Sequence, residues 1–139
     1  DRVMYEEHLK LNARNYASKI GDDFLAKINP FSWSNEMIPP RYTDRKSDFV
    51  ILRGHIRQHE ITFKIPEGYK LGAIAEPVAL EEDFASYKTE IHVEGDTVNY
   101  KRIFKLNEGS YAVDAYEAYR DFYKNVVRED NQKLFIEKL

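Results

Sequence analysis

Residues 86–106 have the sequence "SYKTEIHVEGDTVNYKRIFKL" and carry the clearest structural signal in the chain. Two runs of alternating apolar and polar residues flank the turn triplet Glu94-Gly95-Asp96. Because side chains alternate between the two faces of a strand, this pattern predicts a β-hairpin with one buried and one solvated face. The rows expected to be buried are Tyr87, Thr89, Ile91 and Val93 on the first strand, and Val98, Tyr100, Phe104 and Leu106 on the second.

Arg102 interrupts the second buried row. A guanidinium group is costly to bury unless it is paired, so this side chain must either extend to the rim of the sheet or meet a carboxylate. We expect the rim placement.

The residues before the hairpin are also expected to be extended. Residues 49–65 are predicted to form one long extended stretch, which ends at the turn Pro66-Glu67-Gly68, where proline and glycine supply the backbone angles of a turn. Tyr69 and Leu71 then restart the apolar alternation. Residues 75–80 are predicted to form either an edge strand or an irregular extended segment, because the nitrogen of Pro77 cannot donate to a strand ladder.

The N-terminal part predicts a looser pairing. An alternating run at 8–13 and a short strand at 24–28 surround a turn at residues 21–23, and residues 15–20 fit either an irregular strand or one helical turn. The following stretch is rich in Pro, Ser, Asn and Asp, which favour turns. It predicts a long connection that Trp33 fastens to the core.

Beyond Gly109 the apolar period becomes helical and predicts a helix at about 114–130. The acidic pair Asp114 and Glu117 resembles a capping box at its start. A tyrosine stripe on this helix suits either burial against a sheet or stacking on a ligand, and we expect burial; its members are Tyr116, Tyr119 and Tyr123. Residues 132–138 are predicted to form a last strand.

Composition limits the function classes that fit this chain. With 139 residues, 42% hydrophobic and 32% charged, residues 1–139 are predicted to form one globular domain. A net charge of −3 with interleaved acids and bases argues against a nucleic-acid partner. No apolar run is long enough to span a bilayer, so we expect no membrane insertion. The absence of cysteine excludes disulfides, thiolate metal sites and a Cys nucleophile within this sequence.

His55 and His59 have the HxxxH spacing that binds a metal ion when it lies on a helix. In a strand, however, four residues span about 13 Å, which one ion cannot bridge. We therefore expect solvated strand histidines, no metal site and no cofactor.

Two further groups of polar residues contain the residue types of a catalytic site. His8, Asp22, Asp23 and Ser86 include the residue types of a hydrolase, but no strained turn presents a nucleophile and no G-x-S-x-G motif occurs. The acidic run at residues 81–83 could supply paired carboxylates to a glycoside, yet adjacent acids in a loop usually face water. We expect no catalytic residues and no enzymatic activity. Phe31 and Trp33 are candidates for exposed aromatic residues that stack on a glycan.

The sequence from residue 21 onward resembles a bacterial domain of unknown function that follows a transglutaminase-like core in multidomain proteins. The resemblance rests on an ordered series of segments: "INPF" at 28–31, "IPEGYKL" at 65–71, "EPVAL" at 76–80, "DFASY" at 83–87, "EGDTVNYKRIFKL" at 94–106 and "YEAYRDFYKNVVRED" at 116–130. Residues 15–19 resemble the segment that leads into that domain.

The resemblance implies an antiparallel β-sandwich of immunoglobulin-like architecture with one C-terminal helix packed on it, and residues 1–20 as a lead-in strand region. It implies a periplasmic or otherwise extracytoplasmic location, and a neighbour that carries the Cys, His and Asp residues of a transglutaminase-like site. None of those residues maps onto this chain. We therefore expect a noncatalytic accessory domain that packs on or positions the core or its substrate, with a carbohydrate-binding module as the alternative.

Overall fold

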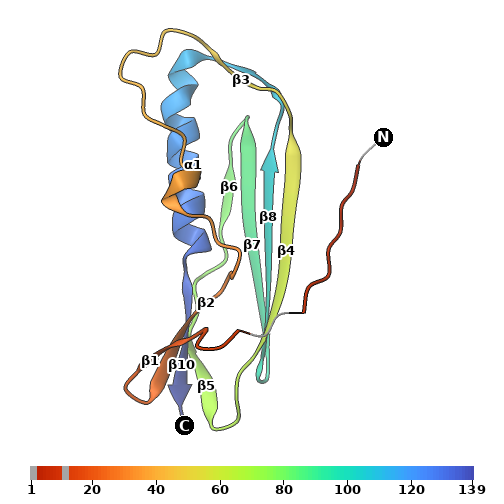
Figure 1. The fold of residues 1–139 in the computed structure, drawn as a ribbon, viewed down its shortest axis with the longest axis vertical. Coiled ribbons are helices and arrows are strands. Elements are labelled where there is room, and N and C mark those ends of the chain that lie inside the picture. The colour runs from red at the N-terminus through yellow and green to blue at the C-terminus, as the bar shows by residue number, and fades with distance from the viewer. Residues whose placement is uncertain (1–2, 11–12) are drawn as a thin grey trace.

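The computed structural model describes residues 3–10 and 13–139, and it is mainly β with antiparallel sheets and one C-terminal helix (Figure 1). The predicted fold class is confirmed. The largest sheet contains four strands in the order β4 (His55–Lys64), β8 (Thr97–Leu106), β7 (Ala85–Glu94) and β6 (Ala79–Glu81). Its short edge strand β6 overlaps residues 75–80, where an edge strand is one of the two predicted alternatives.

The hairpin of β7 and β8 forms the centre of this sheet. It turns at Gly95 and Asp96, and Glu94 pairs with Thr97. Gly95 has φ of 58°, which suits glycine at the first central position of a two-residue hairpin turn. The predicted inward rows are buried except at their ends: Ile91 is half-buried, and Val93 is exposed.

A second, smaller sheet has the order β1 (Ser18–Ile20), β2 (Asp23–Lys27), β10 (Lys133–Lys138) and β5 (Tyr69–Ala73). The predicted last strand and the predicted turn at residues 66–68 are both present. In that turn Gly68 has φ of 82° and the Tyr69 amide donates to the Pro66 carbonyl at 3.1 Å. A separate two-stranded ladder joins β3 (Phe49–Ile51) to β9 (Gly109–Tyr111).

Two predictions about extended segments need correction. Residues 49–65 do not form one strand, because the chain leaves β3 at residue 52 and enters β4 at residue 55 with a different partner strand. The alternating run at 8–13 forms no strand over the residues described there, with residues 11 and 12 outside the description. The first hairpin strand is instead β1, which lies within residues 15–20, the segment whose sequence fits either an irregular strand or one helical turn.

The C-terminal helix α1 (Tyr116–Asp130) follows a 3₁₀ turn at Val113–Ala115, and a second 3₁₀ turn lies at Asn35–Met37. The predicted capping box is wrong, because Ala115 occupies the cap position and no side chain caps the helix. Since the chain enters the helix through the 3₁₀ turn, Asp114 lies inside that turn, and Glu117 contacts Arg120 instead.

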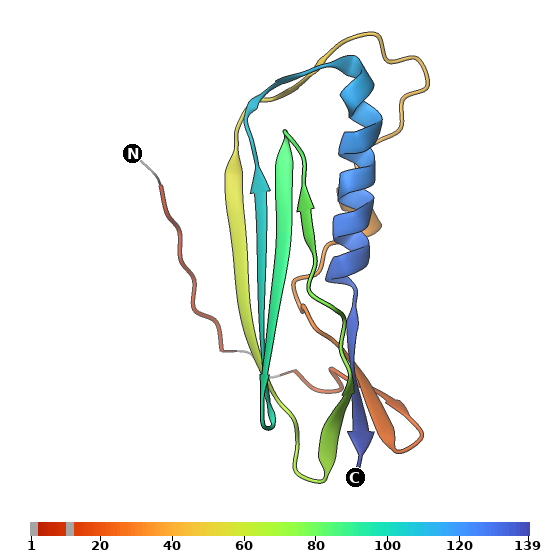
Figure 2. The same cartoon turned by 180° about the vertical axis from the view of Figure 1, so that it is seen from behind.

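The molecule has two layers (Figures 1 and 2). One layer is the large sheet, and the other consists of α1 at one end and the small sheet at the other. The helix end of the core is largely aromatic, and its tyrosine stripe is buried or half-buried as expected. The other end joins both sheets through aliphatic residues and Tyr100. None of the helices described in residues 3–10 and 13–139 is long and apolar enough to cross a membrane.

Candidate functional site: an ion pair between the layers

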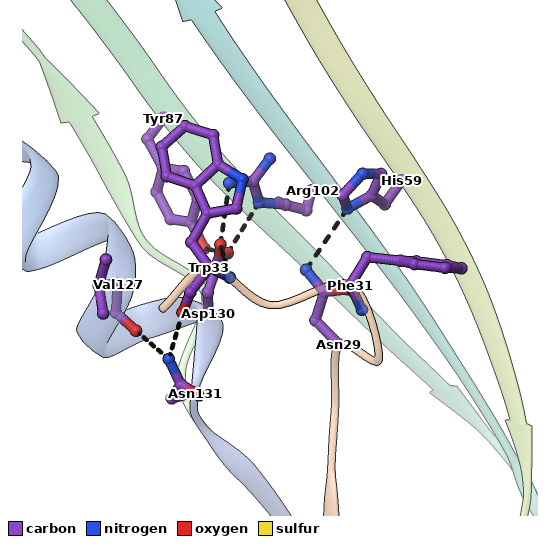
Figure 3. A network of polar contacts seen from close by, with 9 residues as sticks. All are labelled: Asn29, Phe31, Trp33, His59, Tyr87, Arg102, Val127, Asp130 and Asn131. Carbon is purple, nitrogen blue, oxygen red and sulfur yellow. Dashed lines mark hydrogen bonds and ion pairs between the residues drawn. The ribbon is translucent and has the colours of Figure 1, made fainter. Parts of the chain in front are cut away.

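Arg102 lies on the inner face of β8, opposite Thr89 of β7 and His59 of β4. Its side chain is 0% exposed, so the expected placement at the rim of the sheet is wrong. The alternative left open from the sequence, pairing with a carboxylate, is the one found. The reason is that the middle strand of the sheet places residue 102 directly under the end of α1, where a carboxylate faces it (Figure 3).

The partner of Arg102 is Asp130, the last residue of α1, which is also 0% exposed. Arg102 Nε lies 2.7 Å from Asp130 Oδ1 and Nη2 lies 2.9 Å from Oδ2, so the contact is bidentate. A carboxylate is unfavourable at a helix C-terminus, where the free carbonyl groups carry partial negative charge. The guanidinium therefore compensates both the carboxylate and the helix end.

Two further donors complete the coordination of the Asp130 carboxylate. The Tyr87 hydroxyl donates to Oδ1 at 2.9 Å, and the backbone amide of Trp33 donates to Oδ2 at 3.3 Å. Burial and the negative charge of Asp130 raise the pKa of Tyr87 far above its usual value. Tyr87 thus remains a neutral donor, and four hydrogen bonds satisfy the buried anion.

Trp33 covers this ion pair from the long connecting loop. Its ring lies 4.8 Å from the Arg102 guanidinium carbon, 4.6 Å from the Phe104 ring and 5.6 Å from the Tyr123 ring. Trp33 is only 7% exposed, so the sequence-based candidate for glycan stacking is wrong. Its alternative role, fastening the loop to the core, is the one observed. Asn131 supports this position by donating to the Trp33 carbonyl at 2.9 Å.

A polar margin borders the ion pair on the side of β4. Asn29 Nδ2 lies 3.4 Å from His59 Nδ1, and the Asn29 side-chain oxygen accepts from the Phe31 amide at 2.9 Å. The Phe31 ring lies 5.5 Å from the His59 ring and is 44% exposed (Figure 3). The pKa of His59 is lowered, first by burial and then by the positive charges of Arg102 and Arg57. His59 is therefore favoured in its neutral form, which can accept the Asn29 hydrogen bond.

The other residues considered from the sequence do not converge. His8 lies in the exposed N-terminal segment, Asp22 and Asp23 lie at the β1–β2 turn, and Ser86 lies on β7. The acidic residues 81–83 are exposed at the β6–β7 turn. His55 is exposed on β4, as expected, whereas His59 is half-buried. Within residues 3–10 and 13–139, no group of three or more His, Cys, Asp or Glu side chains could hold a metal ion.

Two hollows lie within the part of the chain that the structure describes, and neither is lined by Arg102 or Asp130. A cavity against Tyr100 and Thr89 holds about 10 Å³, which is close to the space that one water molecule needs. An open hollow of about 460 Å³ follows the loop at residues 41–47. In that loop the Arg45 guanidinium is engaged internally, 4.4 Å from the Tyr116 ring and bonded to the Ser47 carbonyl at 3.1 Å.

Asp130 is the participant that the sequence interpretation missed, although a signal was present. The buried stripe of α1 passes through Tyr116, Tyr123 and Val127, and helical spacing carries it on to Asp130. Each of two buried surfaces therefore contains one charged residue, and the two charges have opposite signs. One charged residue in each of two apolar surfaces, with opposite signs, predicts an ion pair between the layers.

The arrangement can fix a loop, a helix end and a sheet to one another. Arg102 Nε and Nη2 are directed at Asp130, whereas Arg102 Nη1 is buried without a hydrogen-bond partner among the described residues. Trp33 covers the ion pair.

A comparison with family models gives a match to residues 23–136. The matching family is described as "Domain of Unknown Function with solved-structure structure (DUF3858)". No curated protein and no solved structure matches the chain.

Proposed function

The chain belongs to the DUF3858 family, and on that premise we propose that it is a noncatalytic accessory domain that packs on, or positions, a transglutaminase-like core or its substrate. The association with such a core rests on the resemblance of the ordered segments between residues 28 and 130. An extracytoplasmic location in a larger bacterial protein is part of the same proposal.

One observation carries this proposal. The fold gathers three buried ionisable groups, and two of them, Arg102 and Tyr87, each donate to the third, Asp130. A catalytic carboxylate or tyrosine needs access to a substrate and a pKa suited to proton transfer. The pKa of Tyr87 is instead raised far from that range. The cluster supports a rigid frame, which suits a domain that holds another domain in place.

A surface for such contact is available at the helix end of the molecule. Exposed apolar side chains occur in β3, in the residues that follow it, and in the loop that precedes it: Met37, Tyr42, Val50 and Leu52. Leu52 is 88% exposed. Val50 and Leu52 are close together in the chain, and neighbouring exposed apolar residues are typical of protein contact sites. We propose that they belong to the face that meets the core.

Calorimetric titration of the purified chain with a purified transglutaminase-like core of the parent protein tests the proposal. The expected result is saturable binding with one site per core, weakened by at least about tenfold in Leu52→Asp, which corresponds to about 1.4 kcal/mol. Val93→Asp is the matched control, since Val93 is an exposed apolar residue near the β7–β8 turn. No association, either between separate chains or within one joined chain, would refute the proposal.

A further inference from the structure

The free edge of β4 is a long and regular surface for strand addition. β4 is the outermost strand on one side of the large sheet, whereas the strand at the opposite edge, β6, has only three residues. All ten residues of β4 pair with β8 without a register shift. Proteins protect an edge strand by shortening it, by a bulge, by proline or by charged side chains, including charges on the inner face. β4 is long, has no register shift and no proline, and its inner face carries one charged side chain, Arg57.

The β7–β8 turn identifies which backbone groups of β4 are free. In a two-residue hairpin the closing pair, here Glu94 and Thr97, is hydrogen-bonded, and bonded pairs then alternate along the ladder. Thr97 and every second residue after it therefore bond to β7, and the residues between them bond to β4. The register then leaves the amides and carbonyls of five β4 residues directed outward: Ile56, Gln58, Glu60, Thr62 and Lys64.

Residues 3–10 form an extended segment on the outer side of this edge. Figures 1 and 2 show that it runs in the same direction as β4, on the side away from β8, and that the gap between the two widens toward the N-terminus. The segment has no assigned strand partner, and its apolar side chains are uncovered, with Val3 at 89% and Tyr5 at 82% exposure. In an extended chain one face carries Val3, Tyr5, Glu7 and Leu9, and the other carries Met4, Glu6, His8 and Lys10. The first face is the more apolar of the two, and Glu7 is its one charged member.

Tyr16 holds the chain close to the end of β4. Its ring stacks on the ring of Phe63 with a centroid separation of 6.5 Å, and its hydroxyl donates to the Lys27 carbonyl at 2.6 Å. The segment that precedes Tyr16 is therefore attached near one end of the free edge. Such a short connection raises the local concentration of the segment at β4 well above that of a separate chain.

The margin of the core along β4 matches the apolar face of the segment. On the inner side of β4, Phe31 remains 44% exposed against His59, and Arg57 is exposed one pleat away. An added strand would place Tyr5 and Leu9 on this inner side, together with Glu7, whose charge is opposite to that of Arg57. The inner face of an added strand and the inner margin of β4 are therefore complementary in both apolar side chains and charge.

We propose that the outer edge of β4 is a binding site for an extended segment, and that residues 3–10 of the same chain occupy it as a fifth, parallel strand of the large sheet. Backbone hydrogen bonds to the five outward residues provide the attachment, and the alternating side chains select the face.

Amide hydrogen exchange measured by NMR on the full chain tests this assignment. The five outward amides of β4 are expected to exchange at least about tenfold more slowly in the unchanged chain than in Tyr5→Asp, because a charged residue on the apolar face opposes docking. Met4→Asp is the matched control: Met4 is 85% exposed but lies on the opposite face, so protection should persist. The amides of Arg57, Ile61 and Phe63, which bond to β8 in either state, report that the sheet remains folded.

Two results would overturn the proposal. One is rapid exchange of the five amides in the unchanged chain, at the rate found in Tyr5→Asp. The other is protection that increases with protein concentration together with a dimeric mass in light scattering, because the occupant would then be a second copy.

Discussion

The contribution of the site to the free energy of unfolding depends mainly on the buried ion pair of Arg102 and Asp130. Both charges are fully removed from solvent, and their attraction offsets a desolvation cost of several kcal/mol per ion. Such a pair contributes little net stability relative to apolar residues of similar size, but the loss of one partner leaves a buried charge without compensation. The pair should therefore be tested by single and double substitution.

Arg102→Met is expected to lower the free energy of unfolding by about 3–5 kcal/mol, because Asp130 is left as a buried anion. The measurement is urea unfolding followed by circular dichroism. Arg102→Met combined with Asp130→Leu should recover most of the loss, since neither charge then remains. A single substitution that costs less than about 1 kcal/mol would contradict a buried, paired guanidinium.

His59 should make stability depend on pH. Its pKa in the folded protein is lowered by burial and by the charges of Arg102 and Arg57, and Asp130 opposes this effect. The unfolded chain therefore binds a proton more readily than the folded chain, and the free energy of unfolding should fall as pH drops through 6.5 towards the lowered pKa. Protonation also removes the acceptor for Asn29.

His59→Gln should flatten this part of the stability profile, measured by urea unfolding at a series of pH values between about 5 and 8. His55→Gln is the necessary comparison, because the pKa of His55 is also lowered, by burial and by Arg57. If the slope stays the same in His59→Gln and disappears in His55→Gln, the assignment to His59 is wrong.

The break between β3 and β4 depends on a close approach at Gly54. A Cβ at this position would lie 2.8 Å from the Leu106 carbonyl oxygen and 3.1 Å from the Glu108 amide nitrogen. Both contacts are with backbone, which cannot move aside as a flexible side chain can. The glycine thus permits the chain to change partner, from β9 to β8, at this point.

Gly54→Ala is expected to lower the free energy of unfolding by about 1–3 kcal/mol, the usual range for overpacking. Thermal unfolding followed by circular dichroism would show this as a lower midpoint. The neighbouring Arg53→Ala, at an exposed position, should leave the midpoint nearly unchanged. Equal midpoints for Gly54→Ala and Arg53→Ala would show that the backbone around residue 54 can move to accept a Cβ.

Strands and helix were predictable from the sequence where their periodicity is long. The β7–β8 hairpin, α1 and β10 follow local patterns that the packing reinforces. The partner change at Gly54 was not predictable, because it depends on which distant strand lies beside each half of residues 49–65. The capping box failed for a related reason: a 3₁₀ turn moved the helix start beyond Asp114.

The ion pair was predictable only in part. The alternation of apolar and polar residues places Arg102 on the inner face of the sheet, so its side chain must either reach the rim of the sheet or pair with a carboxylate. The sequence does not reveal how far the second layer covers that face, and this decides between the two. Trp33 shows the same limit, since a loop aromatic can cover a core or face solvent. Both outcomes depend on the position at which α1 crosses the sheet, and that position is a property of the assembled layers.

The two ends of the core are expected to unfold together. The helix end and the small-sheet end share the β7–β8 hairpin, because the inward β8 residues Tyr100 and Phe104 belong to the small-sheet end and the helix end, respectively. Leu134 lies in the small-sheet end and is 0% exposed, so Leu134→Ala should cost about 2–5 kcal/mol. The single tryptophan, Trp33, lies in the other end, so its fluorescence reports on unfolding there. In urea, fluorescence and circular dichroism should shift to the same lower midpoint. An unchanged fluorescence midpoint beside a lowered circular-dichroism midpoint would mean that the two ends fold as separate units.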